Sequence, residues 1–238
     1  MAQIDPKNST VCVRHNEPQC KNCSKKSNNL FSHLPQEALK HIDESKITKT
    51  YKKNETLFLS GDHPNGIYCV SSGTVKLETE GARGHGHILR VVQGGGVLGY
   101  RSLFADEPYQ GTAIAMEEST VCHIPKTTFL SLIKKFPELA LKILAYISKE
   151  LGAAKGRMIK MTDQSAIERI AESILFLKDN FEYEPWTRKE ISEWAGTTPE
   201  TVMRTLANFE DQGFIIQIGR KIQIANRKAL LELANLEH

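Results

Sequence analysis

Short runs of alternating apolar and polar residues, separated by glycine turns, fill the chain between about Glu55 and Ile124. The runs are TLFLSGD, GIYCVSSGTVKLE, HILRVVQGGG, GTAIAM and STVCHIP. A period of two at this regular spacing is typical of antiparallel strands in a barrel or jelly roll. The pattern predicts one compact β domain, which we place at residues 30–136, after a cysteine-containing segment at residues 1–29.

Beyond Phe136 the apolar residues recur every three or four positions, which is the period of a helix. So long a seam, on a helix between two domains, favours pairing with the same helix of a second chain. The alternative is that the seam packs on its own β domain. We predict a dimerisation helix at residues 137–161 with the following interface residues: Ile143, Ile147, Leu151, Ala154, Met158 and Met161.

Residues 162–238 are predicted to form a winged helix-turn-helix DNA-binding domain. Thr187 followed by Glu190 is a capping box that starts a short helix, and a glycine then supplies a sharp turn. A second helix begins at Thr197 or Thr198, with a proline near its first position. Two short helices around a glycine turn match the motif whose second helix enters the major groove of DNA.

The polar face of this second helix carries the candidate base-reading residues Glu200, Met203 and Arg204, and Thr198 lies at its start. An arginine can bond O6 and N7 of guanine together, a glutamate can accept from N4 of cytosine, and an apolar group can contact a thymine methyl. Glu200 and Arg204 are one helical turn apart, so both point into the groove. The alternatives are a capping bond between Glu200 and Thr197, or a surface ion pair with Arg204 worth ~0.5 kcal/mol.

The segment FIIQIGRKIQI alternates around a tight Gly219-Arg220 turn and predicts a β-hairpin wing. Arg220 and Lys221 at its tip, together with Arg188 and Lys189 at the start of the first helix, are candidate contacts for DNA phosphates. The alternative for each of these basic residues is a solvated position on the surface.

Composition and charge narrow the class of protein. The net charge is only +3, and residues 162–238 hold 9 basic against 13 acidic side chains. Any nucleic-acid binding there must therefore depend on a local patch. No apolar run approaches the ~20 residues needed to span a bilayer, and the N-terminus lacks the features of a secretory signal, so we expect a cytoplasmic protein. No nucleophile–base pair or metalloprotease motif indicates an enzyme.

The order of β-roll, long helix and winged helix-turn-helix resembles the Crp–Fnr family of bacterial transcription regulators, over roughly residues 19–230. PETVMRTL resembles the recognition helix of that family, in which a Glu and an Arg read a TGA-containing half-site. The resemblance implies an α+β fold whose N-terminal β-roll is like a cyclic-nucleotide-binding domain. It also implies a homodimer on a near-palindromic promoter, in contact with RNA polymerase.

Family members that bind cyclic AMP (cAMP) carry a Gly-Glu pair in G-E-x-x-L-F and an Arg-Ser pair soon after it. This chain has GYRSLF, with Tyr100 in the glutamate position, and Gln110-Gly111 where Arg-Ser would be. Burying an anionic phosphate without its cation is costly, which argues against cAMP as the ligand. Arg90 and Arg101 lie nearby and could serve a different effector.

The oxygen-sensing branch of the family holds a [4Fe-4S] cluster with an N-terminal group of cysteines and one cysteine of the β domain. CKNC, with Cys20 and Cys23, and STVCHIP, with Cys122, resemble those segments. The branch has a further cysteine near the position of Asn29, so Cys12 would have to replace it. Four thiolates suffice to hold such a cluster.

Two other interpretations of these cysteines stay open. The same thiols, with His15 or His33, suit a zinc site, or the set holds no metal at all. Cys69 lies inside a predicted strand and is interpreted as a buried apolar residue.

In the oxygen-sensing branch, a charged residue in the dimer helix helps to keep the cluster-free form apart. Ala154 occupies that position here. Because an apolar residue removes the repulsion, we expect a dimer even without a cluster.

Overall fold

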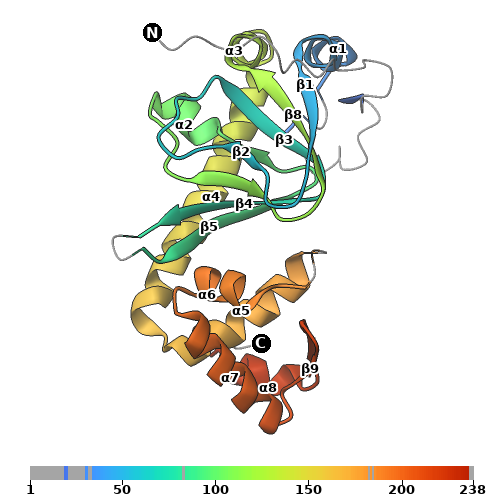
Figure 1. Ribbon diagram of the computed structural model, residues 1–238. Helices are drawn as coiled ribbons and strands as arrows, with labels where there is room; N and C mark the ends of the chain where they lie inside the picture. The colour runs from blue at the N-terminus through green and yellow to red at the C-terminus, as the bar shows by residue number, and fades with distance from the viewer. Residues whose placement is uncertain are drawn as a thin grey trace.

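The structure is a computed structural model that describes residues 19–20, 30–31, 34–81, 84–181, 183 and 185–235 (Figure 1). Of the predicted N-terminal segment it describes only two residues, and Cys12 and Cys23 lie outside the described part of the chain. No helix in the described ranges is both long enough and apolar enough to cross a membrane.

The β domain consists of two four-stranded antiparallel sheets, with strand orders β1-β8-β3-β6 and β2-β7-β4-β5. All five runs predicted from the alternation are strands, which confirms the interpretation as a β domain. The strands are β1 (Ile47–Tyr51), β2 (Thr56–Phe58), β3 (Gly66–Ser72), β4 (Thr74–Glu80), β5 (Gly86–Gln93), β6 (Val97–Leu98), β7 (Thr112–Ala115) and β8 (Ser119–Pro125).

Alternate side chains of the first sheet face two different cores. Val70 on β3 and Val121 on β8 pack in the space between the two sheets. Ile67 and Ile124, on the same two strands, face the other way into a core shared with helices. These helices, of which α1 and α3 lie at the top of the molecule in Figure 1, are α1 (Gln36–Ser45), α2 (Tyr100–Ala105) and α3 (Lys126–Lys135).

Helix α4 (Pro137–Asp163) connects the two halves of the molecule and runs past the β domain toward the C-terminal helices (Figure 1). A proline occupies its first turn, where the missing N–H removes no helical bond. Near its start Leu139 and Ile143 are buried in the core of the chain's own β domain. Farther along, the large apolar side chains of Leu151 and Met158 are exposed.

The C-terminal half is a small helical unit with a two-stranded wing. The predicted helix-turn-helix is confirmed as α6 and α7, and the predicted hairpin as β9 and β10. Buried residues from every helix of this unit form one core, whose aromatic members include Tyr183, Trp186 and Phe209. The elements are α5 (Ala166–Asn180), α6 (Arg188–Ala195), α7 (Pro199–Asp211), β9 (Ile215–Ile218), β10 (Lys221–Ile224) and α8 (Arg227–Leu233).

The two halves share a core. Ile88 and Val91 of β5, and Met116 after β7, belong to the same apolar cluster as the C-terminal helices. Arg157 of α4 donates to the backbone carbonyl oxygens of Ile88 (3.2 Å) and Trp194 (3.2 Å), and so joins the sheet to α6. Its guanidinium also lies over the Trp194 ring, 4.3 Å from the centroid. The helix-turn-helix is therefore fixed to the β domain through α6.

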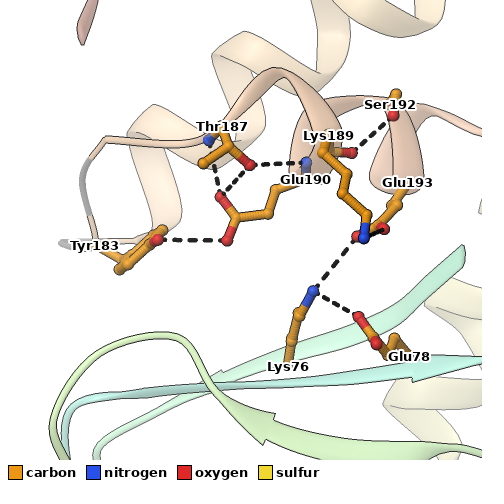
Figure 2. Close-up of polar contacts among 8 residues, drawn as sticks. All are labelled: Lys76, Glu78, Tyr183, Thr187, Lys189, Glu190, Ser192 and Glu193. Atoms are coloured by element: carbon orange, nitrogen blue, oxygen red, sulfur yellow. Dashed lines mark hydrogen bonds and ion pairs between the residues drawn. The ribbon is translucent and has the colours of Figure 1, made fainter. Parts of the chain in front are cut away.

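A buried ion pair also joins the β domain to α6 (Figure 2). The Lys76 ammonium on β4 lies 3.4 Å from a Glu193 carboxylate oxygen on α6 and 2.5 Å from Glu78 on its own strand. The side chain of Glu193 is only 6% exposed. Burial acts to lower the pKa of Lys76, but the hydrogen bond to Glu78 and the charge of Glu193 outweigh it and leave that pKa raised. Lys76 is therefore charged at neutral pH.

We expect Lys76→Met to destabilise the fold by about 2 to 4 kcal/mol, because a buried carboxylate loses its main cation. Lys189, 3.6 Å from Glu193, compensates only in part since its side chain is 77% exposed. The double variant Lys76→Met, Glu193→Gln should recover part of the loss. Urea unfolding measures both. A single variant as stable as the wild type would contradict the assignment.

Candidate DNA-binding surface and sensor site

Helix α6 is fixed at its start by a reciprocal capping box (Figure 2). The Thr187 hydroxyl accepts from the backbone N–H of Glu190 at 3.1 Å, and the Glu190 carboxylate accepts from the backbone N–H of Thr187 at 2.8 Å. The predicted capping box is therefore confirmed. The other oxygen of that carboxylate accepts from the Tyr183 hydroxyl at 3.3 Å. Burial, followed by the charge of Glu190, raises the pKa of Tyr183 above its usual range.

The turn between α6 and α7 depends on a glycine. Gly196 has φ of +64°, a left-handed conformation that side chains with a Cβ disfavour. A Cβ added there would lie 2.8 Å from Sδ of Met161, so the end of α4 packs against this turn. Thr198 is the N-cap of α7, and its hydroxyl accepts from the backbone N–H of Thr201 at 3.3 Å. The cap is thus Thr198, and the alternative of a Thr197–Glu200 box does not occur.

The three candidate base-reading side chains lie together on the solvent face of α7. Glu200, Met203 and Arg204 are exposed, whereas Val202 and Leu206 on the opposite face are buried. Bonds from its own backbone N–H and then from the Thr198 hydroxyl lower the pKa of Glu200, so this carboxylate is an acceptor at neutral pH. Among the described ion pairs none joins Glu200 to Arg204, so the alternative of a surface pair gains no support.

The four candidate phosphate-binding residues have different surroundings. Arg220 and Lys221 are exposed at the tip of the wing, next to Gly219. Arg188 instead donates to the Arg220 carbonyl oxygen at 2.9 Å and bonds the Gln217 amide, so it ties the wing to α6. Lys189 points toward Glu193 and the sheet below it (Figure 2). The side chains of Arg220 and Lys221 therefore stay exposed, although the backbone of Arg220 is bonded to α6.

Helix α4 carries a seven-residue repeat on its exposed part. Leu144, Leu151 and Met158 are spaced by seven residues and are 61%, 54% and 67% exposed. Ile147 is half-buried, and Ala154 is exposed one heptad farther along. Ile143, by contrast, packs in the chain's own core. Leu144 was not among the predicted interface residues, although its spacing from Leu151 is the signal that identifies it.

On the side of the β domain that faces α4, Arg90 on β5 is held by the chain's own groups. It donates to the Val97 carbonyl oxygen at 3.0 Å and to the Tyr100 hydroxyl at 3.1 Å. It also bonds the Tyr146 hydroxyl and lies 2.7 Å from the Glu150 carboxylate, both on α4. Arg90 therefore connects its own sheet, β2-β7-β4-β5, to α4. We call this sheet the sensor sheet. Arg101, the other arginine considered for an effector, pairs with Glu107 at 2.9 Å.

Two of the four predicted metal-ligating thiols lie near one ammonium group. The Lys46 ammonium is 3.5 Å from Sγ of Cys20 and 2.6 Å from the Asp43 carboxylate. Its side chain is 2% exposed. Burial acts to lower the pKa of Lys46, but the hydrogen bond to Asp43, and after it the interactions with Cys20 and Cys122, leave that pKa raised. Burial raises the pKa of Cys20 to about 12. The hydroxyl oxygen of Thr48 lies 3.5 Å from Sγ of Cys122.

Two of the four thiols that a thiolate-bound cluster would use, Cys20 and Cys122, are among the described residues. Cys20 and Cys122 come together from distant parts of the chain, beside a cation that can offset the charge of bound thiolates. Within the described ranges, no group of three or more His, Cys, Asp or Glu side chains is arranged to hold a single metal ion.

We expect Arg90→Met to destabilise the fold by about 1 to 2 kcal/mol at neutral pH, because the half-buried Glu150 loses its cation. Burial already raises the pKa of Glu150 against the effect of Arg90. A raised folded-state pKa of an acid means that stability falls as pH rises through the unfolded value. The loss should therefore shrink toward about pH 4, where the carboxyl is protonated.

Thermal unfolding across this pH range tests the expectation, with Arg90→Met, Glu150→Gln as the matched control. The control should lack the added pH dependence. A loss in Arg90→Met that does not change with pH would show that the Arg90–Glu150 contact is not the cause.

Known protein families match both halves of the chain. The cyclic nucleotide-binding domain matches residues 48–136, and the Crp-like helix-turn-helix domain matches residues 168–233. The chain is 30% identical over 195 residues to the "Fumarate and nitrate reduction regulatory protein" of Escherichia coli (strain K12), covering 78% of each chain. It is 27% identical over 227 residues to the protein of that name from Vibrio cholerae serotype O1, covering 91% of this chain and 90% of that one.

Solved structures share the fold. FixK2 from Bradyrhizobium japonicum is 23% identical, with a TM-score of 0.71 over 81% of this chain and 99% of that one. A Crp/Fnr-family transcriptional regulator from Thermus thermophilus is 25% identical, with a TM-score of 0.68 over 81% of this chain and 100% of that one. With both domains in the same order and a 30% identical relative over 78% of its length, the chain belongs to the Crp–Fnr family of transcription regulators, which bind DNA and are not enzymes.

Proposed function

We propose that the protein is a homodimeric regulator that binds TGA-containing half-sites through α7 and responds to oxygen or redox state through a [4Fe-4S] cluster. The observation that carries the DNA-binding part is the exposure of Glu200, Met203 and Arg204 on one face of a firmly capped α7. The protein acts in the cytoplasm and contacts RNA polymerase at the promoter.

Base recognition follows from the chemistry of the α7 face. The Arg204 guanidinium donates to O6 and N7 of the guanine in TGA, and the ionised Glu200 carboxylate accepts from a cytosine N4 of the paired strand. Met203 lies between them and contacts a thymine methyl. Arg220 and Lys221 at the wing tip bind phosphates and set the register of α7 without reading bases.

Dimerisation brings two α7 helices to a palindromic site. The repeat on α4 has the exposed Leu144, Leu151 and Met158 at one heptad position. The other position has the exposed Ala154 and Met161, and Ile147, which is half-buried against the chain's own core. Two such helices can pack along this seam as a coiled coil. A two-fold dimer then places its half-sites one DNA turn apart.

The sensing part of the proposal rests on the cysteines. Cys20, Cys23 and Cys122 would hold the cluster with a fourth thiolate, for which Cys12 is the candidate that the sequence offers. A bound cluster supplies oxygen-sensitive redox chemistry. Lys46 offsets the charge of the thiolates, and Asp43 holds both Lys46 and the backbone N–H of Cys20 in place. The relatives named for fumarate and nitrate reduction support a redox signal.

A second candidate is a regulator of the same family that holds no cluster and dimerises constitutively. The Arg90 contacts favour it, since the chain's own Tyr146 and Glu150 already join the sensor sheet to α4 without a ligand. Ala154 in the seam also adds no charge that would keep two chains apart. A ligand-binding module without DNA activity is the alternative of another class.

We expect Arg204→Ala to weaken binding to a palindromic TGA duplex by about 1 to 3 kcal/mol and to reduce discrimination at the guanine position. Fluorescence anisotropy at fixed salt measures both. Lys228→Ala is the control, because Lys228 is an exposed cation on α8, paired only with Glu232 in the described ion pairs, and its removal should leave affinity unchanged. If Arg204→Ala binds as tightly and selectively as the wild type, α7 does not read this site.

We expect Leu151→Glu to weaken the dimer at least about tenfold, because two carboxylates would face each other across the seam. Ile159→Glu is the matched control, since Ile159 is 56% exposed on the same helix but lies one residue off the seam. Light scattering after size exclusion, on metal-free protein, measures the mass. A monomeric wild type, or an unaffected Leu151→Glu dimer, would contradict the proposed seam.

A further inference from the structure

Cys69 and Cys122 are directly opposed in the first sheet. β3 and β8 pair antiparallel, and their register places the Cα of Cys69 opposite that of Cys122. Opposed Cα atoms of an antiparallel pair are about 4.5 to 5.5 Å apart, and a disulfide needs roughly 4.4 to 6.8 Å. The two strands therefore already have the backbone spacing of a cross-strand disulfide, although no disulfide joins these cysteines in the structure.

Both cysteine side chains lie on the face of the sheet that is covered by helices. Side chains of directly opposed residues share a face, and so do residues two positions apart on one strand. The opposed pair Ile67 and Ile124, two positions away, is buried in the core beneath α1 and α3. Cys69 packs against that same core. The two thiols are therefore neighbours on one face, with no backbone between them.

The other neighbour of Cys122 on this face cannot form a disulfide. Thr48 of β1 is opposed to Cys122 in the strand register, and its hydroxyl oxygen lies 3.5 Å from Sγ of Cys122. Cys122 itself is 7% exposed. Cys20, which lies outside the sheet, bonds the Lys46 ammonium at 3.5 Å. Of the two residues opposed to Cys122, only Cys69 offers a thiol.

Cys69 is the more accessible of the two thiols. It is only half-buried, whereas Ile67 and Val70 on the same strand are 0% and 1% exposed. The interpretation of Cys69 as a buried apolar residue is thus wrong in its degree of burial. Because oxidation of a thiol follows its exposure, an oxidant reaches Cys69 first and the buried Cys122 reacts second.

We infer that Cys69 and Cys122 form a reversible cross-strand disulfide when the metal-free chain meets hydrogen peroxide. One peroxide oxygen is transferred to Sγ of Cys69, which gives a sulfenic acid and releases one water. Sγ of Cys122 then attacks Sγ of Cys69, so that the S–S bond forms and the S–O bond breaks. The proton of the Cys122 thiol leaves with the hydroxide as a second water, and two electrons have passed from the two sulfurs to the peroxide.

Such a link would make the β domain responsive to oxidants. Disulfides in a reducing cytoplasm are rare, and those that form there are usually transient and redox-sensing. The disulfide itself requires no cluster. One consequence rests on the proposed function: a Cys122 thiolate that binds the cluster cannot also bond Cys69, so the link and the cluster exclude each other.

The test treats reduced, metal-free, full-length protein with stoichiometric hydrogen peroxide and maps disulfides by mass spectrometry of a non-reduced digest. We expect a peptide that links Cys69 to Cys122 and disappears after reduction with dithiothreitol. Cys122→Ser should leave a sulfenic acid on Cys69 that dimedone labels, whereas Cys69→Ser should label Cys122 at least about tenfold more slowly. Cys12→Ser is the matched control and should form the link as the wild type does.

Two results would overturn the inference. One is a wild type in which Cys69 stays unmodified, or is oxidised to a sulfinic acid, without any link to Cys122. The other is a link that joins Cys20 to either of these cysteines. The wild-type map does not depend on the folding of any variant, and circular dichroism checks the variants. The proposed function is tested separately, by cluster assembly and by DNA binding that depends on Arg204.

Discussion

The core that the β domain shares with the helix-turn-helix is the contact on which the rest of the structure depends. The recognition helix can respond to a change in the sensor domain only if the two are rigidly connected. Here Ile88, Val91 and Met116 of the β domain are buried in the same cluster as the C-terminal helices. The Lys76–Glu193 pair and Arg157 add directional contacts to this apolar one. Because Lys76 and Arg157 both bond α6 and neither uses the solvent face of α7, the base-reading side chains stay exposed.

Helix α4 connects this contact to the two other functional regions. Near the middle of α4, Tyr146 bonds Arg90 of the sensor sheet and Glu150 forms an ion pair with it. Arg157, about two turns beyond Glu150, bonds the sheet and α6, and Met161 packs against the turn at Gly196. The exposed face of the same helix carries the heptad seam. A shift of α4 relative to the sheet would therefore change the dimer seam and the position of α7 together.

Local patterns predicted the elements, whereas contacts between distant segments required the structure. Period-two alternation found the strands β2 to β5, β7 and β8, and the Thr187–Glu190 spacing found the capping box. The strand β1 was not predicted, because only Tyr51 of its five residues is buried and its sequence shows no clear alternation. An apolar seam on a helix does not identify the surface that covers it. Ile143 was therefore predicted at the dimer interface, although it packs in the core of the chain's own β domain. The sequence alone does not predict strand register. The position of Lys46 near Cys20 and Cys122, and of Cys69 opposite Cys122, could therefore not be predicted.

The sensor and DNA-binding halves should fold as one cooperative unit, because they share a core. Differential scanning calorimetry of the metal-free chain tests it most directly, because separate domains melt separately while a shared core melts once. A single heat-capacity peak is expected. Two resolved peaks, one for the β domain and one for the helix-turn-helix, would contradict it and would leave α7 without a rigid connection to the sensor.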